Sequence, residues 1–300
     1  MPRPAYPRTV SAALATAELL GAAQWQERDR EHRKRADALT KAHRERSTRG
    51  EKHPVEDFLF TYYSYKPAML RRWHPGEGVE LAGAAGSPRA GWRGYRAGDT
   101  PGGVRVDGEG IRAQHGVLFA NIGRILRATA QRSGSFGCFG LHEWAMVYRE
   151  SDHRHAVPLR LGQKGTDAVV ETHDLRCTHF DAFRFFTREA VPRNRDPLTR
   201  NTQSAHEQPG CLHAGMDLYK WAMKLGPLVP GEVLLDAFEL ARDIRTLDMR
   251  ASPYDLAAWG YDPVPIETAE GKAEYVRAQR DFARRGEGIR SRLIEAIGAP

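Results

Sequence analysis

The sequence predicts an α+β fold that is mainly α-helical, with a small central antiparallel β-sheet. Three observations support this prediction. Long windows in the C-terminal part have apolar residues at helical spacing. Short β-like pieces separated by glycines occupy residues 76–116. The segment 24–53 is densely charged and contains neither glycine nor proline before Gly50, as expected of a solvated helix.

We expect two regions along the chain: residues 1–53 as an N-terminal charged helical segment, and residues 54–300 as a single compact catalytic-type domain. The apolar run "VSAALATAELLGAAQW" is interrupted by Glu18 and is rich in alanine, so it predicts a helix instead of a signal peptide. The stretch "HPVEDFLFTYYSYKP" puts Phe58, Tyr62 and Tyr65 at helical spacing and marks the start of the compact domain.

The middle of the chain carries the predicted strands. "VELAG", "GWRGYRAG" and "GVRVDGEGIRAQ" suit hairpins joined by glycine turns. "AVPLRLGQKGTDAVVETHDLRCTHFDAFRFF" predicts two strands and a turn, the second strand being "HDLRCTHFDAFRFF". From Gly215 onward helices are predicted over "MDLYKWAMKL", "GEVLLDAFELARDIRTLDM" and "GKAEYVRAQRDFARRGEGIRSRLIEAI".

Composition restricts the partners and the setting. The formal net charge of +7 favours acidic partners, nucleic acid above all, although the same arginine-rich usage is typical of high-GC genomes. The chain has only 3 cysteines, which favours a reduced cytoplasmic location. No segment has the length of apolar sequence that spans a bilayer, so no membrane partner is expected. The oligomeric state does not follow from the sequence.

A repeated pattern is the first sign of a site. Cys177 and His179 in "CTHFDAFRFF" are matched by Cys211 and His213 in "CLHAGMDLYKW". Thiolate and imidazole are ligands that Zn²⁺ favours, and these four residues are the candidate metal ligands. On a strand, however, the two side chains of Cys-x-His lie about 6 to 7 Å apart, so free buried thiols beside functional histidines are the alternative.

Carboxylates accompany the histidines. Glu143 follows a histidine directly, Asp181 comes two residues after His179, and Asp217 shares a helix face with His213. Pairs of carboxylate and imidazole perform general acid–base chemistry, and an oxygen-rich His/Asp/Glu set is also the material of a non-haem iron site. Zinc or iron is therefore the cofactor to expect if a metal binds. The alternative is that each pair is an ion pair that supports a helix.

Aromatic and basic residues alternate in "HEWAMVYR", "HFDAFRFFTR" and "MDLYKWAMK". Aromatic rings stack on unpaired bases while basic groups hold phosphates, and core helices with exposed ends have the same pattern. The candidate substrate-binding residues are Trp144, Phe183, Arg184, Tyr219 and Trp221.

Five stretches carry a resemblance to a known family: "HPVEDFLFTYYSYKPAMLRRWHPG", "GLHEWAMVYR", "HDLRCTHFDAFRFFT", "QPGCLHAGMDLYKWAMKLGPLVPGE" and "ARDIRTLDMRASPYDLAAWGYDPVPIET". Over roughly residues 50–280, the chain resembles an actinobacterial family labelled 3-methyladenine DNA glycosylase. Pro230 and Gly231 are similar to part of a helix-hairpin-helix pattern, but Val233 replaces its second glycine and Glu232 precedes that position.

The resemblance implies a DNA-binding hydrolase of base-excision repair that releases alkylated bases. Such an enzyme extrudes the base, stacks it on an aromatic ring and stabilises the sugar cation with a carboxylate while water attacks. The acid implied is Glu143, Asp181 or Asp217. The alternative is a metal-dependent enzyme, using zinc or non-haem iron, that acts on a small molecule through a Cys/His/Asp/Glu pocket. A DNA-binding or scaffold protein without catalysis is the third hypothesis.

Overall fold

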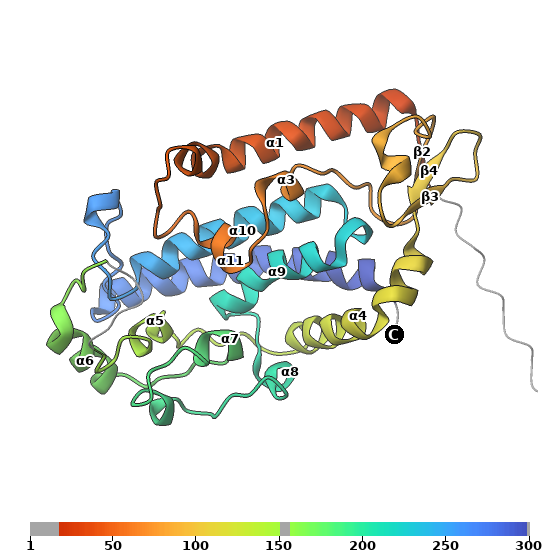
Figure 1. Ribbon diagram of the computed structural model, residues 1–300. Coiled ribbons are helices and arrows are strands. Elements are labelled where there is room, and N and C mark those ends of the chain that lie inside the picture. Colours follow the sequence, from red (N-terminus) through yellow and green to blue (C-terminus); the bar gives the residue numbers. More distant parts are fainter. Residues whose placement is uncertain (1–17, 151–156, 299–300) are drawn as a thin grey trace, which may run out of the picture.

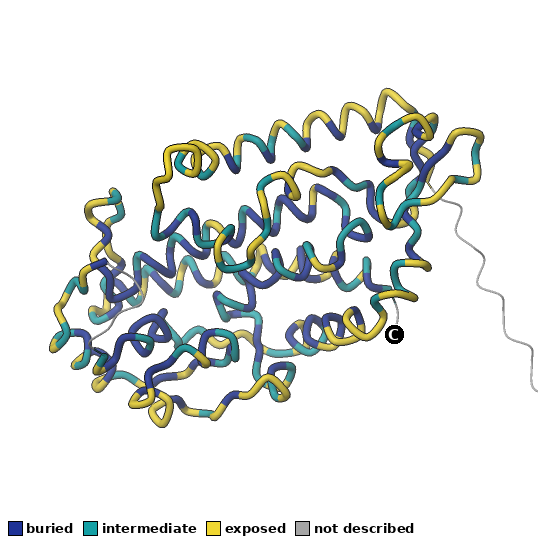
Figure 2. The backbone as a smooth tube through the Cα atoms, in the orientation of Figure 1, coloured by how far each residue is buried: buried dark blue, intermediate teal, exposed yellow. Residues whose placement is uncertain are grey.

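Three long helices form the centre of the fold. The structure is a computed structural model that describes residues 18–150 and 157–298. Helices α9 (Leu212–Leu225), α10 (Gly231–Arg250) and α11 (Ala269–Ile297) pack against one another, and the dark inner faces in Figure 2 mark the buried core that they share (Figure 1). All three helices that the C-terminal periodicity predicts are confirmed.

Close packing of α9 on α10 depends on one glycine. A Cβ atom built on Gly215 would come within 2.8 Å of Ile244 Cδ1, which is closer than real contacts allow. The missing side chain therefore lets the two backbones approach, and it brings the first half of α9 against the second half of α10. Both halves contribute residues to the site described below.

The charged N-terminal segment forms α1 (Ala22–Thr48), which lies along α10 (Figure 1). Arg35 of α1 bonds to Asp236 and Glu239 of α10 at 2.7–2.8 Å. Figure 2 shows that the outward face of α1 is mostly exposed, as the sequence predicts, whereas Trp25 and His32 are buried on the inner face.

The sheet is small and mixed. Its strand order is β1 (Glu18–Leu20), β2 (Val79–Leu81), β4 (Val104–Val106) and β3 (Tyr95–Ala97). The three later strands pair antiparallel as the glycine-turn pattern predicts, but β1 pairs parallel to β2. The prediction of a purely antiparallel sheet is therefore corrected, and Figure 1 places the sheet at one end of the helices.

The apolar run before α1 differs from its prediction. Residues 18–20 form strand β1 instead of a helix, because their backbone pairs with β2. The earlier part of that run lies outside the described residues. The aromatic stretch after α1 gives only a short helix, α2 (Phe58–Tyr62), and Ser64 just beyond it has a positive φ of 60° that breaks helical geometry.

The region predicted as two strands after residue 156 is mainly helix and loop. Residues 162–172 form a helix, and only isolated bridges at Leu159 and Leu175 have β pairing. The aromatic run beyond Cys177 turns into a short helix that begins after His179. The remaining helices are α3 (Pro67–Leu70), α4 (Gly108–Ala130), α5 (Leu141–Ala145), α6 (Gly162–Thr172), α7 (Phe180–Phe183) and α8 (Gln203–His206), with 3₁₀ turns at Pro88–Gly91, Val191–Arg193, Gly226–Leu228 and Ala257–Trp259.

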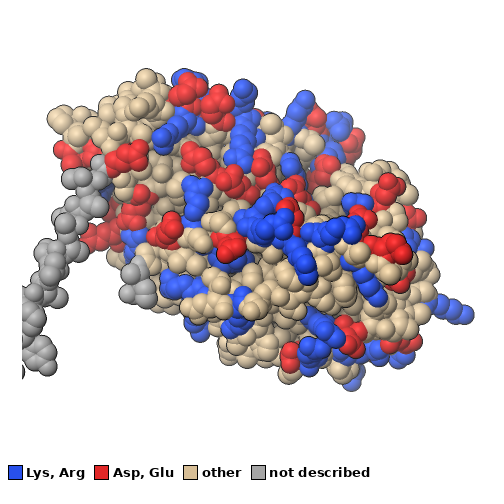
Figure 3. Space-filling view, turned by 180° about the vertical axis from the view of Figure 1, so that it is seen from behind, with Lys and Arg blue, Asp and Glu red and all other residues tan. Residues whose placement is uncertain are grey.

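The surface carries both positive and negative charges. Figure 3 shows lysines and arginines interspersed with acids over one face. Ion pairs account for part of this mixing, since Arg285 bonds to Asp243 at 2.8 Å. Among the described residues, no helix combines the length and the apolar character needed to cross a bilayer.

Candidate metal centre

Helix α5 brings two adjacent polar residues, His142 and Glu143, into the core. The chain enters α5 through Phe139 and Gly140, which both have positive φ, of 49° and 73°. This left-handed turn costs a glycine little, and it sets the direction of the short helix. Trp144 then anchors α5, because its indole Nε1 donates to the carbonyl of Ala251 at 2.8 Å.

The first group of candidate ligands comprises His142, Glu143, His213 and Asp248, from α5, α9 and α10. One ligand atom from each residue lies within 4.8 Å of the others. His142 Nε2 is 2.8 Å from Asp248 Oδ1, and both residues are buried. Nitrogen and carboxylate oxygen at this spacing are the donors that first-row divalent metals bind in proteins.

Arg245 holds the two carboxylates of the first group. Its NH1 donates to Glu143 at 2.9 Å and to Asp248 at 3.2 Å, and the side chain is 2 % exposed. The guanidinium carbon also lies 3.9 Å from the centroid of the Phe58 ring. A buried charge of this kind fixes the carboxylates in place and reduces their mutual repulsion.

The second group comprises His179, Glu207 and Asp217, again with ligand atoms within 4.8 Å of one another. His179 Nε2 lies 3.2 Å from Asp217 Oδ2 and 3.3 Å from Glu207 Oε1. All three residues are buried. The loop that carries Glu207 is fixed by Gln203, whose Nε2 donates to Glu207 Oε1 at 2.6 Å. Two carboxylates therefore face one imidazole nitrogen inside the protein.

Two further side chains contact Asp217. Tyr63 donates its hydroxyl to Asp217 Oδ1 at 2.9 Å. The Lys220 ammonium contacts Asp217 Oδ2 and lies 3.4 Å from Asp181 Oδ2. Burial raises the pKa of Asp217, but Lys220 and His179 lower it by a larger amount. The net shift is downward, so the group is a carboxylate.

His213 lies between the two groups. Its ring centroid is 4.4 Å from that of His142 and 5.3 Å from that of His179. Its ring forms no hydrogen bond with the residues that the structure describes. Burial and the two neighbouring imidazoles lower the pKa of His213 well below its usual value, so the ring is neutral and has a free lone pair.

The other two histidines have the opposite shift. Burial lowers the pKa of His142, but Asp248 outweighs it and the net shift is strongly upward. Glu207 and Asp217 likewise outweigh burial at His179 and raise its pKa. The carboxylates therefore favour the protonated form of both rings, and a metal ion that binds either ring would have to displace that proton.

Comparisons with protein-family models, with curated proteins and with solved structures found no match to this chain. The geometry of the two groups is therefore the basis for any assignment of function.

Of the four predicted metal ligands, the structure brings only the histidines into the two groups of candidate ligands. His179 and His213 are members of the two groups, whereas neither group includes Cys177 or Cys211. Burial and the nearby thiols raise the pKa of Cys177 well above its usual value. The pKa of Cys211 is also raised, mainly by burial. Both thiols therefore carry their protons, and the partners of the two histidines are carboxylates.

The three predicted catalytic acids lie in different surroundings. Glu143 belongs to the first group and Asp217 to the second. Asp181 lies at the edge, where its side chain is 16 % exposed and pairs with Arg184 at 3.2 Å. The sequence therefore identifies acids near one site but does not distinguish their roles.

The predicted substrate-binding aromatics are core residues. Trp144, Phe183, Tyr219 and Trp221 are all buried. Arg184 alone among the five has an exposed side chain, and its guanidinium lies over the ring of Phe185 at 4.0 Å.

Three members of the two groups were not among the predicted site residues: His142, Glu207 and Asp248. His142 directly precedes Glu143 in "GLHEW", and this adjacency is a usable signal for a shared site. Asp248 lies 106 positions from His142, and no local pattern joins them. Glu207 lies in a loop sequence, "AHEQPG", that is typical of exposed turns.

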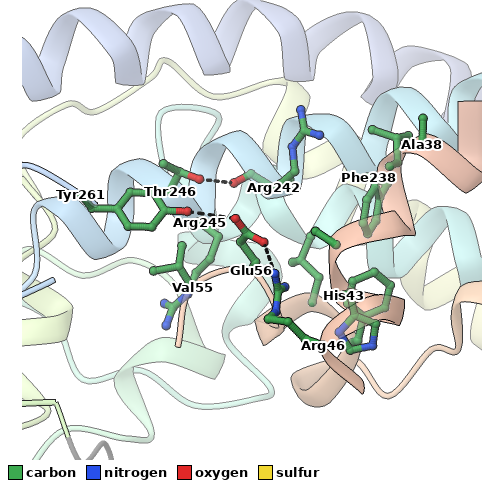
Figure 4. Close-up of a pocket in the computed structure, with 14 residues that line it drawn as sticks. Ala38, His43, Arg46, Val55, Glu56, Phe238, Arg242, Arg245, Thr246 and Tyr261 are labelled. Atoms are coloured by element: carbon green, nitrogen blue, oxygen red, sulfur yellow. Dashed lines mark hydrogen bonds and ion pairs between the residues drawn. The ribbon is translucent and has the colours of Figure 1, made fainter. Parts of the chain in front are cut away.

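A pocket of about 360 Å³ lies between α1 and α10, beside the first group. Figure 4 shows Glu56, Arg46 and Tyr261 converging in it, and the tyrosine hydroxyl and Arg46 both donate to Glu56. His43 stacks on Phe60 at 3.9 Å to form an aromatic wall. Arg245 lines this pocket and also contacts the two carboxylates of the first group.

Proposed function

We propose that this chain is a metal-dependent enzyme whose metal ion is bound by His142, Glu143, His213 and Asp248. The observation that supports the proposal is the convergence of these four donors, three of them buried, brought from three helices to within 4.8 Å of one another. A neutral imidazole without a hydrogen-bond partner among the described residues, His213, is one of the four. Arg245 supplies one positive charge to the two buried carboxylates, and a divalent metal would supply the positive charge that two carboxylates still lack.

The donor set indicates the chemistry. Two imidazoles with carboxylates are the ligands of zinc hydrolases and of non-haem iron enzymes, and in both the metal activates an oxygen ligand. Arg245 would keep Glu143 and Asp248 oriented, as outer partners of metal ligands do. The pocket beside Arg245 has the volume and the mixture of aromatic and polar walls that suit a small molecule.

Metal analysis of the untagged protein tests this proposal. Plasma mass spectrometry should find zinc or iron in near-stoichiometric amount. His142→Ala and Asp248→Asn should weaken the binding of this ion at least tenfold. His115→Ala is the matched control, because this histidine of α4 lies outside both groups and should leave the binding unchanged. Protein without metal that also fails to take up Zn²⁺ or Fe²⁺ would refute the proposal.

One observation favours the DNA glycosylase hypothesis as a second candidate. Asp181 is the only one of the three predicted acids that is not buried among the described residues. Basic groups surround it: Arg184, Lys220, and Arg200, which also lies over the Phe180 ring at 5.3 Å. Such an edge is suited to phosphates and a stacked base. An assay for release of 3-methyladenine from methylated DNA tests this candidate.

A further inference from the structure

The second group has the same features as the proposed metal site but is not part of it. His179, Glu207 and Asp217 are 1 %, 2 % and 2 % exposed. Their donors are one imidazole nitrogen and two carboxylates, which face one another across 3.2–3.3 Å. Nothing in the proposed single-metal site explains why two further carboxylates are buried here.

We propose that His179, Glu207 and Asp217 bind a second divalent cation, so that the centre holds two metal ions with His213 between them. This inference rests on the proposed function. His213 lies at 4.4 Å from His142 of the first group and 5.3 Å from His179 of the second, by ring centroids. Paired metals a few ångströms apart activate and position the oxygens in many hydrolytic reactions.

An unpartnered atom supports this assignment independently. His179 Nδ1 is buried and has no hydrogen-bond partner among the described residues, although Nε2 on the same ring faces two carboxylates. A buried imidazole nitrogen without a partner is costly. No contact fixes the proton of His179 on either nitrogen, so Nδ1 can keep a proton while Nε2 gives up its own to bind a cation.

The charges around the second group leave room for a cation. Asp181, Glu207 and Asp217 are three carboxylates, and Lys220 is the amine that contacts two of them. Arg184 and Arg200 also reach Asp181, but their side chains are 41 % and 71 % exposed, so water screens them. With His179 neutral, the three carboxylates exceed the one ammonium by two charges, and a divalent ion would balance them.

The outer edge of the second group is partly exposed. Lys220 and Asp181 have side chains 12 % and 16 % exposed, so this edge borders solvent. Tyr62 and Tyr65 are half-buried in the segment beside them. A hydrated ion can therefore reach Asp217 by displacing the Lys220 ammonium, which keeps its contact with Asp181.

The test is the stoichiometry of Mn²⁺ and of Zn²⁺ on the full-length protein, measured by calorimetric titration and by plasma mass spectrometry after dialysis. Two ions per chain are expected, and His179→Gln and Asp217→Asn should reduce the count to one. His142→Ala should remove the first ion. Far-ultraviolet circular dichroism identifies any variant that fails to fold, and the wild-type count decides the question without a variant.

Lys220→Met sharpens the test because the lysine and a metal would compete for Asp217 Oδ2. Removing this cation should tighten binding of the second ion about tenfold or more. Weaker binding in Lys220→Met would contradict the proposal. One ion per chain that is lost in His142→Ala and kept in His179→Gln would overturn the second site and leave the proposed function standing. No ion of either metal would overturn both.

Discussion

Replacing Arg245 by methionine should destabilise the protein in the absence of metal. The guanidinium is 2 % exposed and lies 2.9 Å from Glu143 and 3.2 Å from Asp248, so the variant leaves two buried carboxylates without their cation. Loss of one partner from a buried ion pair costs about 3 to 5 kcal/mol. For a chain of this size, that corresponds to a fall in melting temperature of roughly 6 to 10 °C.

The assay is thermal and urea unfolding of chelator-treated protein, repeated with excess Mn²⁺. The ion would restore positive charge beside Glu143 and Asp248, and binding at a hundredfold excess over Kd should recover about 3 kcal/mol. Arg242→Met is the control, because this arginine lies one turn earlier on α10 and its side chain is 45 % exposed. Equal losses in the two variants, or no recovery with metal, would refute the reasoning.

Three other predictions concern separate parts of the molecule. Burial and nearby cations lower the pKa of His74 to about 3, so the unfolded chain takes up a proton at this residue first as the pH falls. The stability that neutral His74 contributes is therefore complete above pH 6.5 and decreases toward pH 3; wild type should lose about 1 to 2 kcal/mol more than His74→Asn between pH 7 and pH 5, measured by urea unfolding. Gly215→Ala should cost about 1 to 3 kcal/mol because its Cβ meets Ile244, whereas Gly288→Ala, with open space around the Cβ on α11, should be neutral or stabilising; equal effects of the two would contradict the packing argument. If the glycosylase candidate holds, Asp181→Asn should lower the rate of 3-methyladenine release at least a hundredfold, and an unchanged rate would exclude Asp181 as the acid.

Helical periodicity was sufficient to predict α9, α10 and α11, because each of these helices buries one continuous face. The alternation of apolar and polar residues in "HDLRCTHFDAFRFF" wrongly predicted a strand. Leu175 and Cys177 are buried there and alternate with polar neighbours, yet Asn194 takes up both backbone groups of Cys177 in place of a strand partner. A side chain from a distant loop thus replaces the sheet, which local pattern does not reveal.

The sequence predicted which kinds of residue form the site better than it predicted which individual residues do. Carboxylates near the histidines at Glu143 and Asp217 were visible as neighbours in sequence or on one helix face. The thiols of Cys177 and Cys211 precede the two histidines at the same spacing, but only the histidines are members of the two groups. Contacts across α5, α9 and α10 depend on tertiary packing, which local patterns in one sequence do not predict.

The separation of His142 from Asp248 also affects how the protein is made. The two residues are 106 positions apart, so at ribosomal rates roughly 5 to 20 s pass between their synthesis. During that interval His142 and Glu143 have been translated, but α10, which carries both Arg245 and Asp248, has not. The nascent chain therefore has to keep these polar groups hydrated until its C-terminal half emerges, and the centre is assembled among the last parts of the fold.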